Sequence, residues 1–191
     1  MKVCLFGASS NALDAAYYSD ARKLGNLLAL AGDALVYGGS ERGIMKACAD
    51  GIMDCGGRLI GVAPLFFRDA GVVSGRCSEV IYTRTMSERK QKMEDNSDAF
   101  IVLPGGVGTF DELFETITLK QLNFHSKPIV LLNTLDYFNE TIAMLSAAAE
   151  KGFLGKGCLN LFQVCSTPEE AVSYIHSSEA CLQTGSGLIY N

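Results

Sequence analysis

Short apolar runs rich in β-branched residues alternate along this chain with longer segments of helical periodicity. The runs that predict strands are residues 2–6, 34–37, 58–62, 79–82, 99–103, 129–132 and 161–164. The segments that predict helices are residues 14–31, 44–55, 86–96, 110–124, 135–151 and 168–176. Repeated strand and helix units of this kind fold onto a parallel sheet whose faces the helices cover. The predicted fold class is therefore α/β.

The length of the chain predicts a single domain. It has 191 residues, of which 48% are hydrophobic, and this is enough to bury a core of its own. The sequence has no linker, repeat or low-complexity tract, so residues 1–191 are expected to form one domain. Residues 63–78 lack clear periodicity and are expected to form a loop over the strand ends, and residues 177–191 a C-terminal tail.

Charge, hydropathy and cysteine spacing exclude several classes of partner. The net charge is -5 without a long run of like charge, so nucleic acid is not an expected partner. No apolar run reaches the roughly 18 to 20 residues of a membrane-spanning helix, and the first residues enter a strand-like run directly. We therefore expect a soluble protein without a signal peptide. The seven cysteines are scattered and include no C-x-x-C pair, which is typical of reduced thiols in the cytoplasm and not of a disulfide framework or a zinc site.

Three of the predicted strands end in glycine-rich turns. These turns are residues 7–10, 38–40 and 105–108. In open parallel sheets, ligands bind at the carboxyl ends of the strands. The three turns are therefore expected to line one crevice.

The third turn has the composition of an anion site. Gly105, Gly106 and Gly108 have no side chains, so backbone N–H groups can approach an anion closely, and the following helix adds about half a positive charge at its N-terminus. The turn therefore predicts a phosphate ligand. It lacks the lysine of a Walker A loop and the spacing of a G-x-G-x-x-G fingerprint, which disfavours an ATPase and a nicotinamide dinucleotide enzyme. The alternative is that the glycines only turn the strand into the helix.

Two glutamates follow threonines at the spacing of a capping box. Thr85 with Glu88 is expected to be structural. Thr109 with Glu112 has two interpretations. Glu112 either caps the helix or serves as a catalytic carboxylate near the sugar of a bound nucleoside monophosphate.

Arg89 and Lys90 lie in the first turns of a predicted helix. The helix macrodipole disfavours cations at this end, so an anionic ligand would explain them. The alternative is a solvated basic face that also includes Lys92.

Two motifs together resemble those of a known family. Residues 86–90 read Met-Ser-Glu-Arg-Lys, and residues 104–112 read Pro-Gly-Gly-Val-Gly-Thr-Phe-Asp-Glu. This pair is similar to the M-x-x-R-K and P-G-G-x-G-T-x-x-E motifs of the Lonely Guy (LOG) family. The segments that extend the resemblance are residues 7–10, 37–39 and 121–128. The segments that depart from the family's pattern are residues 39–40, 44–46 and 63–78, the last of which would help to enclose the base.

The resemblance implies a Rossmann-like three-layer fold with a mostly parallel central sheet, a homodimer and a hydrolase. The family cleaves the N-glycosidic bond of cytokinin riboside 5'-monophosphates or of AMP, releasing free base and ribose 5-phosphate. By position, Arg89 and Glu112 would be the catalytic pair. The residues that would bind the nucleoside monophosphate are Lys90, Gly105, Gly106, Val107, Gly108, Thr109, Ser9, Gly39 and Met86. The resemblance implies no cofactor and no metal.

Two other functions are compatible with the sequence. One is a nucleotide-binding or molybdenum-cofactor-carrier-like protein without hydrolytic activity, against which the retention of both Arg89 and Glu112 argues. The other is a broader nucleosidase that prefers AMP or another ordinary monophosphate. The family's former label, possible lysine decarboxylase, has no support from the sequence, because no lysine stands in a recognisable pyridoxal-phosphate context.

Overall fold

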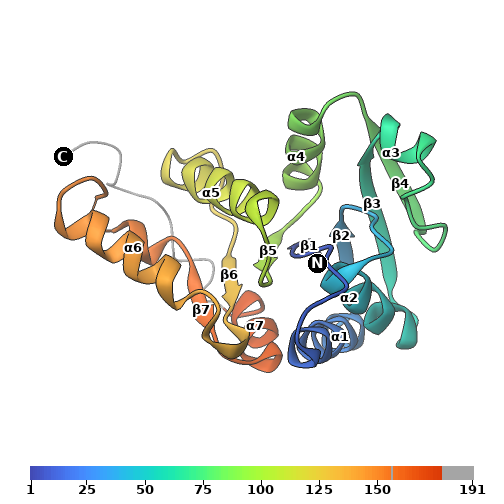
Figure 1. Cartoon of the computed structure of the whole chain (residues 1–191), viewed down its shortest axis with the longest axis horizontal. Coiled ribbons are helices and arrows are strands. Elements are labelled where there is room, and N and C mark those ends of the chain that lie inside the picture. Colours follow the sequence, from blue (N-terminus) through green and yellow to red (C-terminus); the bar gives the residue numbers. More distant parts are fainter. Residues whose placement is uncertain (156, 178–191) are drawn as a thin grey trace.

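The computed structural model describes residues 1–155 and 157–177. Its centre is a seven-stranded sheet in the order β4-β3-β2-β1-β5-β6-β7, in which neighbouring strands are parallel (Figure 1). The strands are β1 (Lys2–Phe6), β2 (Ala34–Tyr37), β3 (Arg58–Pro64), β4 (Glu79–Thr83), β5 (Ala99–Val102), β6 (Ile129–Leu132) and β7 (Gln163–Cys165). The predicted α/β class and the parallel sheet are confirmed.

Helices cover both faces of this sheet, which makes three layers. On one face lie α1 (Ala15–Leu30), α2 (Gly43–Asp54) and α7 (Pro168–Ile175). On the other face lie α4 (Met86–Asp95), α5 (Val107–Gln121) and α6 (Asn139–Glu150). Figure 1 shows α1 and α2 below the strands and α4 and α5 above them. The short helix α3 (Leu65–Asp69) stands beside β3 and β4.

The strands are apolar on both faces because both faces are covered. Along β1, Val3 and Leu5 pack against the side of α1 and α2. Cys4 and Phe6, which alternate with them, pack into the core under α4 and α5. All four side chains are buried. A doubly covered parallel sheet therefore explains the short continuous apolar runs in the sequence.

The chain changes its direction across the sheet at β1. It moves outward from β1 through β2 and β3 to β4, and then returns to place β5 on the other side of β1. Helix α1 leaves β1 toward one face, whereas α5 leaves β5 toward the other. The loops that follow β1 and β5 therefore diverge, and a cavity of about 300 Å³ lies between them. This is the position at which open α/β sheets bind their ligands.

Two predicted boundaries near the strand ends are wrong. Strand β3 runs on to Pro64 and α3 follows, within the segment expected to be a loop over residues 63–78. A five-residue helix is too short to produce a periodic pattern, so no local pattern predicts it. Helix α5 begins at Val107, earlier than the predicted residue 110, because the preceding glycines complete the turn sooner.

Two further boundaries differ in the C-terminal half. The helix expected over residues 135–151 begins only at Asn139, because Leu135 and Asp136 have left-handed φ angles of 52° and 59° that an α-helix does not accommodate. The strand expected over residues 161–164 is β7, and a 3-10 turn at Cys158–Asn160 precedes it. Apart from Ser177, the predicted tail lies outside the described residues.

Two general properties of the described residues bear on the earlier expectations. The six described cysteines are free thiols. No helix in the described part of the chain is long and apolar enough to cross a membrane. That residues 1–191 form one domain stays a prediction.

Candidate active site

Hydrogen bonds join the first glycine-rich turn to the third turn and to the start of α2, the helix that follows the second turn. The amide of Ala8 in the first turn donates to the carbonyl of Pro104 in the third, at 3.1 Å. The carbonyl of Ala8 accepts from the amide of Ile44 at the start of α2, at 3.0 Å. The side chain of Asn11 accepts from the amide of Gly43 at 2.8 Å. The expectation that the turns line one crevice is confirmed for the first and third turns, which both line the cavity beside α5, whereas no residue of the second turn lines it.

The third turn presents backbone donors at the start of α5. Gly106 is the residue that precedes the helix, and the first helical N–H groups have no carbonyl partner in a preceding turn. Gly106, Val107 and Gly108 are exposed, so their amides are accessible to a ligand. Gly105 must be glycine, because a side chain there would overlap Thr109. The turn therefore has the geometry of an anion site at a helix N-terminus.

Arg89 reaches from the first turn of α4 to the carboxyl edge of the sheet. Its Nε donates to the carbonyl of Val62 in β3 at 3.2 Å. Its Nη1 donates to Oε1 of Glu112 at 2.8 Å. Gly38, at the end of β2, leaves room for the guanidinium, since a Cβ at this position would lie 2.5 Å from Nη2. Arg89 is thus bound into the site, and the alternative of a solvated basic face is wrong for this residue.

Glu112 and Arg89 form an ion pair that is almost out of contact with water. The side chain of Glu112 is 11% exposed and that of Arg89 9% exposed. Burial raises the pKa of the Glu112 carboxyl above its ordinary value, although Arg89 acts in the opposite direction. A buried carboxylate with a raised pKa is a stronger base than a glutamate at the surface, and such groups are candidates for acid–base chemistry.

The capping interpretation of Glu112 is wrong. Because α5 begins at Val107, Thr109 lies inside the first turn, and its amide donates to the carbonyl of Gly106 at 3.0 Å. One half of the other capping pattern is confirmed in α4, while the Glu88 side chain accepts from the amide of Arg84 and not from that of Thr85. The side chain of Thr85 accepts from the amide of Glu88 at 3.0 Å.

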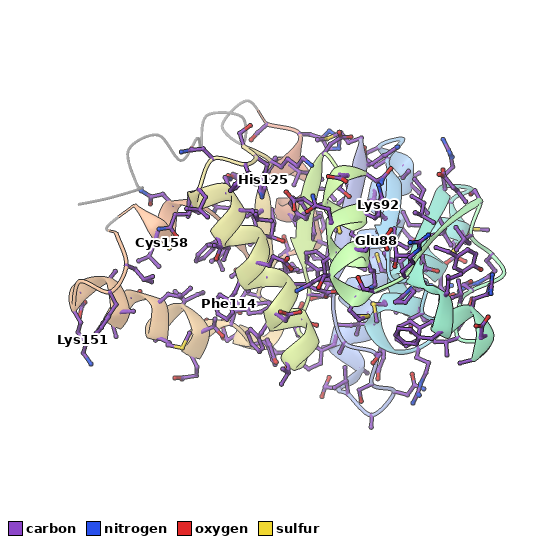
Figure 2. The ribbon with its side chains drawn as sticks, turned by 90° about the horizontal axis from the view of Figure 1, so that it is seen from above. Glu88, Lys92, Phe114, His125, Lys151 and Cys158 are labelled. Atoms are coloured by element: carbon purple, nitrogen blue, oxygen red, sulfur yellow. The ribbon has the colours of Figure 1, made fainter. Side chains whose placement is uncertain are left out.

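Lys90 lies one residue beyond Arg89 and points toward α5. Its Nζ forms ion pairs with Asp111 at 2.9 Å and with Glu115 at 2.6 Å. Figure 2 shows Glu88 and Lys92 on the same helix, beside α5 with Phe114. Lys90 therefore connects α4 to α5.

The other residues expected to bind substrate are spread along the same edge. Ser9 is exposed in the first turn, and Met86 is 44% exposed at the start of α4. Gly39 is buried with a left-handed φ of 71°, and its carbonyl accepts from the amide of Ser74 at 2.8 Å. Val73 packs over Gly39, so part of the segment expected to be a loop does cover the second turn.

Sequence reasoning missed the groups that hold these loops in place. Arg76 forms ion pairs with Glu41 at 2.9 Å and with Asp50 at 2.6 Å, which fasten the covering loop to α2. Tyr137, after β6, donates from its hydroxyl to the carbonyl of Gly105 at 2.5 Å. No local pattern marks either contact, because the partners are far apart in the sequence.

The cavity beside the third turn is mostly apolar. Its lining residues are Ala8, Ser10, Leu13, Tyr17, Pro104, Gly105, Gly106 and Tyr137. Among the described residues, no group of three or more His, Cys, Asp or Glu side chains is placed to hold a metal ion.

A parallel sheet with a glycine turn before α5 and a buried Arg–Glu pair at its carboxyl edge defines a Rossmann-like α/β protein with a candidate anion site. Residues 45–175 match the family described as Possible lysine decarboxylase. The chain belongs to this family, whose members include the LOG proteins.

The relatives agree with this assignment. The chain is 36% identical over 180 residues to "Cytokinin riboside 5'-monophosphate phosphoribohydrolase LOG4" of Arabidopsis thaliana, covering 94% of this chain and 84% of the relative. It is 38% identical over 170 residues to the probable enzyme of that name, LOGL1, of Oryza sativa subsp. japonica, covering 88% and 76%.

The structure resembles two solved proteins of another kind. The Moco carrier protein of Chlamydomonas is 22% identical with a TM-score of 0.69, over 91% of this chain and 94% of that one. The molybdenum cofactor binding protein of Rippkaea orientalis is 25% identical with a TM-score of 0.65, over 91% and 93%. At 22% identity, the likeness to the Chlamydomonas protein shows only that the two proteins share a fold.

The ion pair predicts a stability change that depends on pH. In Arg89→Gln, the Glu112 carboxylate loses its cation while it stays buried, so its pKa rises further. We expect the variant to lose roughly 3 kcal/mol of unfolding free energy at neutral pH. The pKa of this carboxyl is 4.5 in the unfolded chain and higher in the folded protein. As the pH rises from 4.5 through the folded-state pKa, the buried carboxyl loses its proton and the fold loses stability. The deficit should therefore shrink toward pH 4.5 in urea unfolding.

The matched control is the double variant Arg89→Gln with Glu112→Gln, which buries no charge at either position. It should recover most of the lost stability at neutral pH. A single Arg89→Gln variant as stable as the wild type at every pH would mean that the pair contributes nothing to the fold.

Proposed function

We propose that this chain hydrolyses the N-glycosidic bond of a purine or cytokinin riboside 5'-monophosphate, such as AMP, to free base and ribose 5-phosphate. The observation that carries the proposal is the buried Arg89–Glu112 pair, in which Glu112 belongs to the helix that the glycine turn begins. Glu112 is four residues after Gly108, about 6 Å along the helix axis, comparable with the span of a ribose from its phosphate to C1'. Relatives named phosphoribohydrolases, 34 to 36% identical over most of the chain, support it.

The turn before α5 would hold the phosphate. The amides of Gly106, Val107 and Gly108 are accessible donors, and the helix dipole favours an anion there. Thr109 and Ser9 offer hydroxyl groups near it, as the family resemblance implies. Binding the phosphate in this way would fix the ribose over Glu112 without a metal or another cofactor.

Glu112 would then act at C1', the carbon at which the bond to the base breaks. Cleavage breaks the bond between C1' and the base nitrogen, whose electron pair leaves with the base, and the ribosyl group becomes cationic. The Glu112 carboxylate stabilises that cation and takes a proton from the water whose oxygen bonds to C1'. The departing base ends with a proton on a nitrogen, so the overall reaction consumes one water.

Arg89 would support the carboxylate and the leaving group. It holds the Glu112 carboxylate through Nη1, and its charge opposes the effect of burial on the Glu112 pKa. Arg is too basic to be an efficient proton donor, so its effect on the departing base is electrostatic. Lys90 and Met86 would contact the substrate from the start of α4, and Gly39 from the second turn, as the resemblance implies.

A substrate panel tests the activity. With wild-type protein, AMP should release adenine about a hundredfold or more faster than adenosine, because only AMP has the phosphate that positions C1'. Free base and ribose 5-phosphate should form in equal amounts in a chromatographic assay of several nucleoside monophosphates.

Equal rates for AMP and adenosine would show that the turn before α5 is not the phosphate site. Tight binding of a monophosphate without release of base from any member of the panel would favour the alternative, a non-hydrolytic nucleotide-binding or molybdenum-cofactor-carrier-like protein.

Glu112→Gln tests the catalytic carboxylate. The amide can still accept a hydrogen bond from Arg89, but it has neither the charge that stabilises the cation nor the base that activates water. Turnover should fall by roughly a hundredfold or more while AMP binding persists. Wild-type kcat/KM should also fall as pH drops through the raised pKa of Glu112, at a pH above 4.5, because protonation removes the base.

The matched control is Glu88→Gln, on α4 next to Arg89. Among the described residues, the Glu88 side chain accepts one hydrogen bond, from the amide of Arg84 at 2.8 Å. A glutamine side chain can accept the same bond, so base release should be unchanged. Near-normal turnover by a folded Glu112→Gln protein would remove this carboxylate from the mechanism.

We also propose that the chain forms a homodimer, as the family resemblance implies. Several large apolar side chains of the described surface are more than half exposed, including Val107, Phe124 and Phe153. Light scattering at micromolar concentration should give twice the 20.5 kDa mass of one chain. A mass near that of one chain would contradict the proposal.

A further inference from the structure

The loop between β6 and α6 reaches across to the glycine turn before α5. At its end, the hydroxyl of Tyr137 donates to the carbonyl of Gly105. The Tyr137 ring lies parallel to Phe110 of α5 with centroids 6.4 Å apart, and it meets Tyr17 of α1 edge-on at 6.3 Å. Rings from two helices therefore fix the direction in which the hydroxyl points.

The backbone before Tyr137 is in an unfavourable conformation. Leu135 and Asp136 are consecutive residues in the left-handed region, which favours glycine. Neighbouring contacts hold them there. The amide of the fully buried Phe138 donates to the side chain of Asn133 at 2.7 Å, and the hydroxyl of Thr134 donates to Asp20 at 2.7 Å. Such strain persists only where surrounding structure enforces it, and it clusters at functional sites.

The Tyr137 contact constrains the direction of one backbone donor in the glycine turn. The carbonyl of Gly105 and the amide of Gly106 belong to one planar peptide, in which C=O and N–H point in opposite directions. When the hydroxyl holds the carbonyl on the side of the aromatic rings, the Gly106 N–H must point away from them. Main-chain hydrogen bonds hold the carbonyls of Pro104 and Gly106 on either side, but between two glycines no side chain limits rotation of this peptide, and the hydrogen bond to its own carbonyl comes from Tyr137.

We propose that Tyr137 is a positioning residue for phosphate: it orients the Gly106 amide through the Gly105 carbonyl. The inference rests on the proposed function, since it concerns the same anion site. It adds Tyr137, which lies outside both family motifs, to the residues that determine phosphate binding. The strained loop after β6 is then part of the binding site, although the Tyr137 hydroxyl acts through the turn and not on the substrate.

Tyr137→Phe tests the proposal because it keeps the ring and removes the hydroxyl. The dissociation constants of AMP and of inorganic phosphate, measured by calorimetry, should both rise about tenfold. In turnover, KM for AMP should rise by a similar factor while kcat stays within about twofold. Slow cleavage of adenosine, which has no phosphate, should not change. In the wild type, phosphate should shift the amide NMR signal of Gly106, and in the variant this shift should be smaller.

Tyr82→Phe is the matched control. It removes the hydroxyl of a 40% exposed tyrosine on β4 that does not line the cavity beside the glycine turn. Its affinity for AMP and phosphate should equal that of the wild type.

Three results would overturn the proposal. They are wild-type affinity for AMP and phosphate in Tyr137→Phe, an equal loss in Tyr82→Phe, and an equal effect on AMP and adenosine cleavage. Because calorimetry needs no hydrolysis, a wild type that binds AMP without cleaving it would refute the proposed activity and still decide the role of Tyr137. A wild type that binds neither AMP nor phosphate would refute both.

Discussion

Hydrogen bonds between main-chain atoms hold the strand-end turns in fixed positions relative to one another, and the candidate site depends on them. Ala8 uses its amide for Pro104 and its carbonyl for Ile44, so one residue joins the turns after β1 and β5 to the start of α2. Side chains could change without breaking these bonds. The helices that follow the turns leave toward opposite faces, and the space between them opens where β1 and β5 are neighbours.

The charged pair at this edge balances two opposing effects. Removing a carboxylate from water raises its pKa, and a neighbouring guanidinium lowers it. In Glu112 the effect of burial is the larger one, so the carboxylate is held in place and still binds a proton more readily than a surface glutamate. Arg89 has a second anchor on the carbonyl of Val62, which keeps its charge at the strand ends.

The sequence predicts the elements that local residue patterns determine. It does not predict the features that depend on contacts between residues far apart in the chain. The strands β1, β2 and β6 have the predicted bounds, because each is a short apolar run between polar turns. The Thr109–Glu112 spacing suggested a cap, but Glu112 pairs with Arg89, 23 residues away in the sequence, and no local pattern records such a partner. The left-handed residues Leu135 and Asp136 carry no glycine signal, because tertiary contacts impose their conformation. The family motifs identified Arg89 and Glu112 as the candidate pair. The burial of the pair and the hydrogen bond of Arg89 to Val62 depend on tertiary contacts that no motif encodes.

The guanidinium of Arg89 occupies the volume that a side chain at position 38 would need. Two positions far apart in the chain thus share one space, so a side chain at position 38 requires the Arg89 guanidinium to move from its hydrogen bonds with Val62 and Glu112. A lineage that gained a side chain at 38 would first have to shorten or move residue 89, and would lose the ion pair in the interval. The turn after β2 should accordingly evolve more slowly than other partly exposed turns, even though Gly38 itself performs no chemistry.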